Sequence, residues 1–179
     1  MSNISIIDYR SEHQQWFESL NRAWIEKYFV MEPSDIAVLT RPDENIIGKG
    51  GAILMAECEG EIAGTVALKR IDSTSFEFTK MAVDERFRRR GIAEKLSYAS
   101  FLKAKELGAE TVILYSNSVL RGAIILYEKL GFVHKPVANS GYKRSDVMMV
   151  IDAETAASSA EVYFNNLMKS QSFTTIPSR

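Results

Sequence analysis

A cluster of arginines follows an apolar run near the middle of the chain and precedes a segment with helical spacing. Its members are Arg86, Arg88, Arg89 and Arg90. Guanidinium groups donate forked hydrogen bonds that suit phosphate oxygens. A helix start adds unpartnered backbone N–H groups and a partial positive charge. Gly91 and Ala93 are small enough to let a phosphate approach that backbone. The cluster therefore indicates a diphosphate site, although a solvated basic turn or a targeting patch remains an alternative on the arginines alone.

Composition narrows the classes of function. The 179 residues suit one domain, and a net charge of -1 disfavours a broad electrostatic contact with nucleic acid. Cys58 is the only cysteine and His13 and His134 are the only histidines, so the sequence offers no intramolecular disulfide and disfavours a metal site. No signal peptide is recognisable, and no apolar run approaches the roughly 20 residues that span a membrane. We therefore expect a cytoplasmic protein that uses no metal and contacts neither membrane nor nucleic acid.

Hydrophobic periodicity predicts an alternation of strands and helices. Strands are expected over residues 4–7, 52–58, 62–71, 75–83, 111–115, 132–137 and 146–151. Helices are expected over residues 12–29, 35–39, 42–47 and 92–107, from a cap at Ser116 or Ser118 to Leu130, and over residues 154–168. This order predicts one mixed α/β domain over residues 1–151, with a helix and polar tail over residues 152–179 appended to it.

Two motifs in this order resemble the GNAT superfamily of N-acetyltransferases. They are R-x-x-G-x-A at residues 88–93 and A-I-x-L-Y-E-K-L-G-F at residues 123–132. K-M-A-V at residues 80–83 and Y-K-R-S-D-V-M-M at residues 142–149 are also similar. The resemblance implies a mixed α+β fold with a mostly antiparallel, splayed sheet of about seven strands flanked by helices. It further implies that acetyl-CoA binds where two central strands part, with its diphosphate on the arginine turn.

The resemblance also implies which residues bind the cofactor. They are Met81, Ala82, Val83, Arg88, Arg89, Arg90, Gly91, Ile92, Ala93, Asn117 and Tyr127. The backbone near Met81 and Val83 would pair with the pantetheine arm and offer an N–H group to the thioester oxygen. The chain departs from the family where Leu120 replaces an asparagine that often precedes the family's tyrosine by seven residues. Asn117 is the nearest amide and is expected to contact the pantetheine arm instead.

Two residues are candidates for catalysis. Tyr127 is expected to protonate the departing CoA thiolate, and the alternative is a helix tyrosine that only packs its ring. Glu77 is the candidate base for the amine, and the alternative is a solvated glutamate on a strand. Alternation along the strand places Glu77 on the side opposite its phenylalanine neighbours, together with Met81 and Val83, unless a bulge changes the parity. Apolar surroundings on that side would raise the pKa of Glu77.

The acceptor slot is expected between the first helices and the loop that joins the last two strands. Its candidate residues are Trp24, Tyr28, Glu32, Tyr142 and Arg144, and the alternative for the aromatic ones is core packing. Glu32 or Asp35 would attract an ammonium group, and Arg144 would hold a carboxylate. The predicted function is transfer of an acetyl group to a primary amine of a small molecule or peptide. A non-catalytic acyl-CoA sensor with the same fold is the alternative, and the C-terminal helix leaves a homodimer open.

Overall fold

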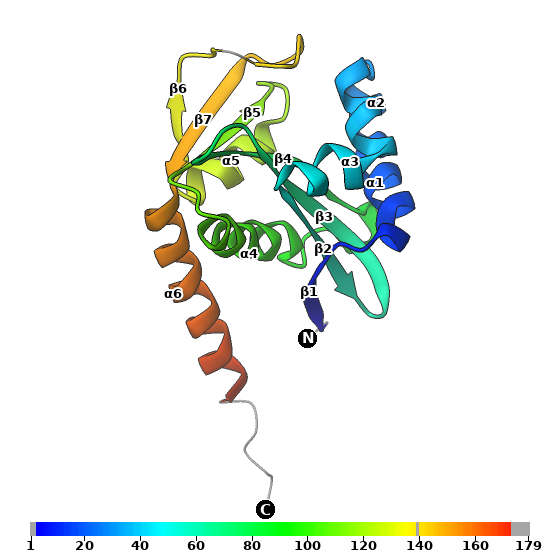
Figure 1. Cartoon of the computed structure of the whole chain (residues 1–179). Helices are drawn as coiled ribbons and strands as arrows, with labels where there is room; N and C mark the ends of the chain where they lie inside the picture. Colours follow the sequence, from blue (N-terminus) through cyan, green and yellow to red (C-terminus); the bar gives the residue numbers. More distant parts are fainter. Residues whose placement is uncertain (1–2, 139, 173–179) are drawn as a thin grey trace, which may run out of the picture.

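A seven-stranded sheet forms the centre of the computed structural model, which describes residues 3–138 and 140–172 (Figure 1). The strands lie in the order β1-β2-β3-β4-β5-β7-β6. Their bounds are β1 Ile4–Asp8, β2 Ala52–Cys58, β3 Glu61–Arg70, β4 Ser75–Val83, β5 Thr111–Ser116, β6 Val133–Lys135 and β7 Val147–Asp152. Every neighbouring pair is antiparallel except β4 and β5, which run parallel. The predicted mixed α/β fold with a mostly antiparallel sheet is confirmed.

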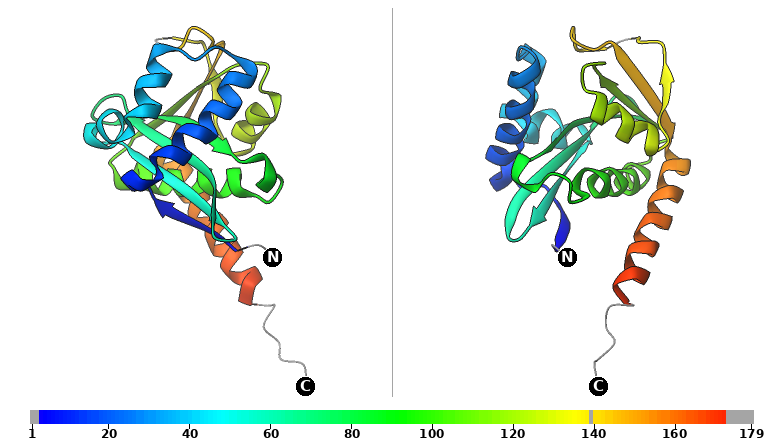
Figure 2. Two further views of the ribbon diagram at one scale, coloured as in Figure 1. Left: turned by 90° about the vertical axis from the view of Figure 1, so that its right-hand side faces the viewer. Right: turned by 180° about the vertical axis from the view of Figure 1, so that it is seen from behind.

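Helices cover both faces of this sheet (Figure 2). They are α1 Gln14–Tyr28, α2 Pro33–Thr40, α3 Pro42–Asn45, α4 Ile92–Glu106, α5 Arg121–Lys129 and α6 Ala153–Ser172. Helices α1 and α2 bury Phe17, Ile25 and Leu39 against one face of β2 and β3. Helix α4 buries Leu96 and Phe101 against the other face, in the larger of the two apolar cores. The two cores hold the sheet from both sides, so the positions of its central strands are fixed.

The C-terminal helix packs on α4 and then runs away from the sheet (Figure 1). The rings of Tyr98 on α4 and Tyr163 on α6 stack with their centroids 4.3 Å apart. Its buried alanines, among them Ala156 and Ala160, belong to the same core as α4. Among the helices that the structure describes, none is long and apolar enough to cross a bilayer.

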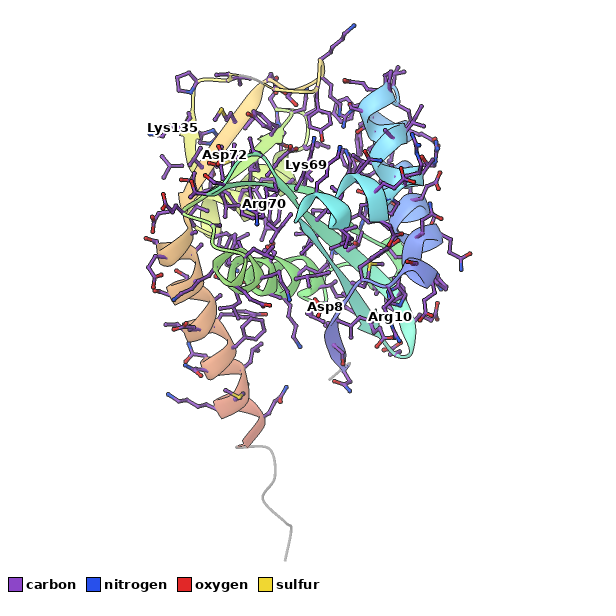
Figure 3. All side chains as sticks on the ribbon, viewed as in Figure 1. Asp8, Arg10, Lys69, Arg70, Asp72 and Lys135 are labelled. Atoms are coloured by element: carbon purple, nitrogen blue, oxygen red, sulfur yellow. The ribbon has the colours of Figure 1, made fainter. Side chains whose placement is uncertain are left out.

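The end of β3 is tied to neighbouring turns by one arginine. Arg70 donates hydrogen bonds to the carbonyl oxygens of Asp72 and Ser73, at 3.5 and 3.2 Å, and its guanidinium lies 4.6 Å from the centroid of the Phe76 ring (Figure 3). It also reaches the carbonyl of Leu107 at the end of α4. These contacts fix the turn from which β4 begins.

Helix α5 begins later than the sequence analysis predicts, at Arg121, with Leu120 as its N-cap. The predicted caps are therefore wrong. Ser118 donates its hydroxyl to Asp146 at 2.6 Å instead, and its N–H also reaches that carboxylate. The Asn117 side chain accepts the N–H of Val119 at 3.0 Å, which holds the segment in a turn before the helix starts. The serine pattern correctly marks the loop but does not identify the cap.

Strand β4 contains a bulge at Lys80 and Met81, opposite the single residue Val66 of β3. Lys80 has a φ of 53°, in the left-handed region that a lysine rarely adopts. Glu77 lies opposite Lys69 and Val83 lies opposite Gly64, so these two β4 residues point to different faces of the sheet. The expectation that Glu77 shares a face with Met81 and Val83 is wrong, because the bulge shifts the alternation by one residue.

Candidate active site

A cavity of about 1280 Å³ lies where β4 and β5 part. These strands pair only from Ser75 to Glu77 on β4 and from Thr111 to Ile113 on β5. Beyond these residues β4 and β5 no longer pair, and the residues that follow on both line the cavity. Its volume exceeds the roughly 300–1,000 Å³ usual for a drug-sized ligand. The opening therefore has room for a large ligand, or for two ligands that meet.

The turn after β4 forms one corner of this cavity. Helix α4 starts there, with Gly91 as its N-cap at a φ of 79°. A Cβ at Gly91 would meet nothing within 4 Å, so the glycine is required by the backbone conformation. Within the described chain, the N–H groups of Gly91, Ile92 and Ala93 donate to no protein acceptor. Because α4 is 15 residues long, its start presents unpaired donors and the positive end of a full helix dipole.

The four arginines of this turn play different parts. Arg86, Arg88 and Arg89 line the cavity, and Arg88 also pairs with Glu85 at 3.2 Å. Arg90 turns to the hairpin between β2 and β3, where it pairs with Glu59 at 2.7 Å, and it is absent from the cavity wall. Arg86 is held by Asp84 and Glu61, each at 3.0 Å. The carboxyl of Asp84 has a lowered pKa, mainly because it accepts hydrogen bonds from Arg86. Two of the four arginines are therefore well placed to meet an anion in the cavity.

Strand β4 supplies one wall through Met81, Ala82 and Val83, as the sequence analysis expects. Asn117, from the loop after β5, lies on the wall as well. Its amide donates to the carbonyl of Arg144 at 2.6 Å, so that its nitrogen already serves to hold a neighbouring loop. Ile92 is buried below this wall and packs in the core, where it can contribute its backbone N–H but not its side chain.

Tyr127 on α5 reaches the same cavity. Its ring packs edge-on against Phe78 and Phe132, with centroid distances of 5.8 and 6.1 Å. Burial raises the pKa of the phenol to about 12. Among residues 3–138 and 140–172 its hydroxyl has no hydrogen-bond partner. The side chain is thus fixed by its ring, and its phenol is protonated at neutral pH.

Glu77 points to the face of β4 opposite that of Val83, and it is absent from the cavity wall. It is only 6% exposed, and it interacts with Tyr142, which lines the cavity. The Tyr142 hydroxyl interacts with both Thr79 and Glu77, and burial together with the Glu77 charge raises the pKa of this phenol. The surroundings of Glu77 are therefore polar and charged, in contrast to the apolar environment that the sequence analysis expects.

A buried ion cluster, which we call the Asp35 cluster, consists of Asp35, Lys80 and Arg144. Asp35 is fully buried and accepts the Lys80 ammonium at 2.7 Å. Both terminal nitrogens of Arg144 donate to Asp35, at 2.6 and 2.9 Å. Burial opposes the charge of Asp35, but the hydrogen bonds from Arg144 and the Lys80 charge lower its pKa on balance. Burial also lowers the pKa of Lys80, although Asp35 counteracts this effect.

The predicted acceptor residues gather around this cluster. Trp24, Tyr28, Tyr142 and Arg144 all line the cavity, together with Phe29. Tyr142 covers the cluster, since the Lys80 ammonium lies 4.8 Å from the centroid of its ring. Glu32 does not line the cavity and instead accepts the backbone N–H groups of Lys143 and Arg144, at 3.2 and 3.3 Å. Glu32 and Asp35 therefore serve to hold the loop after β6 against α2, while the cations face the cavity.

Lys80 is the residue of this site that the sequence analysis does not single out. It appears there only within the K-M-A-V motif, although a lysine among apolar strand residues is an available signal. Arg121 and Gly122 at the start of α5 also line the cavity without having been expected. No group of three or more histidine, cysteine, aspartate or glutamate side chains within the described residues is placed to hold a metal ion.

Comparison with known proteins agrees with this geometry. A family model described as an acetyltransferase (GNAT) domain matches residues 49–134. An uncharacterised N-acetyltransferase of Escherichia coli, YjgM, is 35% identical over 48% of this chain and 53% of its own length. The match therefore spans about half of that relative. Among solved structures, a GNAT-family acetyltransferase of Staphylococcus aureus has a TM-score of 0.76 at 20% identity, covering 84% of this chain and 99% of its own. A YncA acetyltransferase from Salmonella typhimurium, solved with acetyl-CoA, has a TM-score of 0.68 at 15% identity over 84% and 94% of the two chains.

Proposed function

Because this chain belongs to the GNAT superfamily, we propose that it transfers the acetyl group of acetyl-CoA to a primary amine by direct attack. The observation that carries the proposal is the opening between β4 and β5, which ends at unpaired N–H groups and two arginines. An opening of this kind offers a long ligand a binding path between two strands and an anion site at its end.

The residues present fit acetyl-CoA. Its diphosphate would lie on the N–H groups of Gly91, Ile92 and Ala93, with Arg88 and Arg89 as forked donors. A side chain larger than that of Ala93 on this wall would reduce the room for it. The unpaired edge of β4 at Met81–Val83 offers backbone groups to the amides of the pantetheine arm. The volume of the cavity accommodates both this ligand and an acceptor.

Acetyl-CoA would supply an acetyl thioester, and the chain would supply position, electrostatics and proton transfer. A backbone N–H near Met81 would donate to the thioester oxygen, where negative charge develops as the amine attacks. Donors of this type contribute roughly 3–4 kcal/mol in known acyl-transfer enzymes. The bulge at Lys80 turns the backbone of β4 at this position, and a bulge is a common device for aiming such groups.

Two side chains would move protons. Tyr127 is protonated at neutral pH, since its pKa of about 12 lies far above 7, and it would protonate the thiolate that leaves. Glu77 would accept the proton of the ammonium group. Since Glu77 is absent from the cavity wall and interacts with Tyr142, which lines it, that proton would pass through the Tyr142 hydroxyl or a water molecule.

A free-thiol assay tests the proposal. Incubating the protein with acetyl-CoA and a panel of primary amines should release CoA thiol in an acceptor-dependent manner. A non-catalytic acyl-CoA sensor would bind acetyl-CoA but release no thiol with any amine, and it would be indifferent to Tyr127→Phe. Loss of both binding and thiol release would contradict the proposal as a whole.

A further inference from the structure

Several cations line the cavity, and two pairs of them lie on separate parts of its wall. Arg88 and Arg89 form the first, and the proposed diphosphate accounts for it. Lys80 and Arg144 form the second part, and the proposed binding of acetyl-CoA does not account for these two cations. The three carboxylates nearby, Glu32, Asp35 and Glu77, are absent from the wall and stand behind it. At the second part the charged side chains on the wall are the two cations, whereas Asp84 and Glu85 line the wall together with the arginines of the first part.

The carboxylates are also largely satisfied by the protein. Asp35 accepts the Lys80 ammonium, two nitrogens of Arg144 and the N–H of Glu32 at 3.0 Å. Glu32 accepts two backbone N–H groups and, at 3.5 Å, Arg144. A carboxylate offers about four acceptor positions. Little capacity is left in Asp35 or Glu32 to attract a positively charged substrate.

Lys80 and Arg144, in contrast, have more N–H donors than hydrogen bonds in the described part of the chain. An ammonium has three N–H donors and a guanidinium five. Within the described part of the chain, Lys80 donates only to Asp35, and the Nε atom of Arg144 donates to no acceptor. Arg144 keeps 14% of its side chain exposed, whereas Lys80 is nearly buried below the Tyr142 ring. Arg144 is therefore the direct contact for a ligand, and Lys80 adds its charge from behind.

Asp35 fixes these cations before any ligand arrives. A forked, two-point contact holds the plane of the Arg144 guanidinium, and Glu32 holds the backbone on which it stands. Preorganised donors lose little freedom on binding, which favours a small anion. A second ammonium group beside Lys80 and Arg144 would face two cations, and the neighbouring carboxylates Glu32, Asp35 and Glu77 do not line the wall, which disfavours polyamines as acceptors.

We propose that the acceptor is an amine that carries a carboxylate close to its amino group, such as an α-amino acid, and that Arg144 binds this carboxylate with the support of the Lys80 charge. The inference rests on the proposed function. Lys80 directly precedes Met81, near which the thioester would lie, so carboxylate and reacting amine must be close neighbours in the acceptor. The aromatic side chains of Trp24, Tyr28 and Phe29 on the same wall would contact the rest of the molecule.

Matched acceptors test this inference. Each standard L-amino acid with a primary amine is compared with its α-carboxamide, which removes the charge at almost unchanged shape, and with putrescine and spermidine. Thiol release gives kcat/KM for each. A hydrogen bond to a charged group typically changes binding by about 10-fold or more. At least one free amino acid should therefore exceed its amide by about 10-fold, and it should exceed both polyamines.

Two substitutions test whether the Asp35 cluster causes the preference for the free acid over its amide. Arg144→Gln should reduce the acid-to-amide ratio to near 1, because glutamine can still donate to Asp35 but carries no charge. Lys80→Met should reduce the ratio by at least about threefold and serves as a second variant if Arg144→Gln does not fold. Arg41→Gln is the matched control, since the Arg41 side chain is 63% exposed and its one ion pair among the described residues is with Glu44, at 3.6 Å. It should leave the ratio unchanged.

Binding of acetyl-CoA, followed by the shift in melting temperature, separates the two proposals. Stabilisation by acetyl-CoA together with equal or better use of amides or polyamines would overturn the carboxylate inference and leave the proposed function standing. Acetylation of no amino acid by a protein that acetyl-CoA stabilises would overturn it equally, as would an unchanged ratio in both variants. Absence of stabilisation would overturn the proposed function and this inference with it.

Discussion

The two cationic parts of the cavity wall are built in opposite ways. The arginine turn is local, because its arginines and the start of α4 lie within Arg86–Ala93, and its side chains are largely exposed. The Asp35 cluster is assembled from distant segments, since Asp35 is 45 residues from Lys80 and 109 residues from Arg144. It is also buried, with side-chain exposures of 0% for Asp35 and 2% for Lys80. Binding of an anion depends in the first case on a helix start, and in the second on tertiary packing.

This difference separates the expected effects of substitution. At the arginine turn a lost side chain remains surrounded by water, so binding should change while stability does not. In the Asp35 cluster a lost partner leaves a buried charge without compensation, so stability should fall together with substrate binding. The predictions that follow use this contrast, from the largest expected effect to the smallest.

Asp35→Ala should cause the largest loss. It would leave Lys80 and Arg144 buried without their shared counter-ion, and breaking a buried pair costs about 3–5 kcal/mol of the free energy of unfolding. For a chain of this size such a loss lowers the melting temperature by roughly 10 °C. Asp8→Ala is the control, because the Asp8 side chain is 72% exposed and its carboxylate forms an ion pair with Lys103 at 3.3 Å. Equal melting temperatures of the two variants would contradict the structural role of Asp35.

Tyr127→Phe should reduce kcat without weakening the binding of acetyl-CoA. The phenol is the only part removed, and the ring contacts with Phe78 and Phe132 remain. General acid catalysis typically contributes about 10²–10⁴-fold, so we expect kcat to fall by about 100-fold in the thiol assay. The dissociation constant for acetyl-CoA should stay within about twofold. Unchanged kcat would show that the thiolate is protonated by another group.

Arg88→Ala and Arg90→Ala should differ, although the sequence analysis places both residues in the cofactor site. Arg88 lines the cavity, whereas Arg90 pairs with Glu59 on the hairpin between β2 and β3. Loss of a charged hydrogen bond to phosphate should weaken acetyl-CoA binding by about 10-fold in Arg88→Ala. Arg90→Ala should change it by less than about threefold. Isothermal titration calorimetry measures both, and an equal effect would mean that Arg90 turns toward the ligand when it binds.

Lowering the pH should have the smallest and most gradual effect on the stability of the protein. The pKa of Asp35 is held below its ordinary value, so the unfolded chain binds protons more readily than the folded one. The stability that this group contributes is complete above its unfolded pKa of about 3.9 and is lost as pH falls through its folded value. Between pH 5 and pH 3 the parent protein should therefore lose more stability in urea unfolding than Asp35→Asn does. Parallel curves for the two proteins would contradict the ionised state of Asp35.

The same contrast explains how much the sequence alone could predict. The arginine turn, the helix start at Gly91 and the motif around Tyr127 are continuous in sequence, so their residue types and spacing indicate their structure. The strands that part at Glu77 follow from the family resemblance. The side of β4 that Glu77 occupies depends on one extra residue in the bulge, which the apolar pattern does not reveal. The link between Asp35, Lys80 and Arg144 depends on packing across the whole sheet, and so no local pattern predicts it.

Calorimetric or thermal-shift titration with acetyl-CoA tests the central claim most directly, using the parent protein, Gly91→Glu and Gly91→Ala. Both variants impose a side chain on a residue with a φ of 79°, but only glutamate places a negative charge at the start of α4. We predict that acetyl-CoA at about 100 times its dissociation constant stabilises the parent protein by about 2.7 kcal/mol. Gly91→Ala should retain part of this stabilisation and Gly91→Glu should lose it. No stabilisation of the parent protein, or full stabilisation of Gly91→Glu, would contradict a diphosphate site at this helix start.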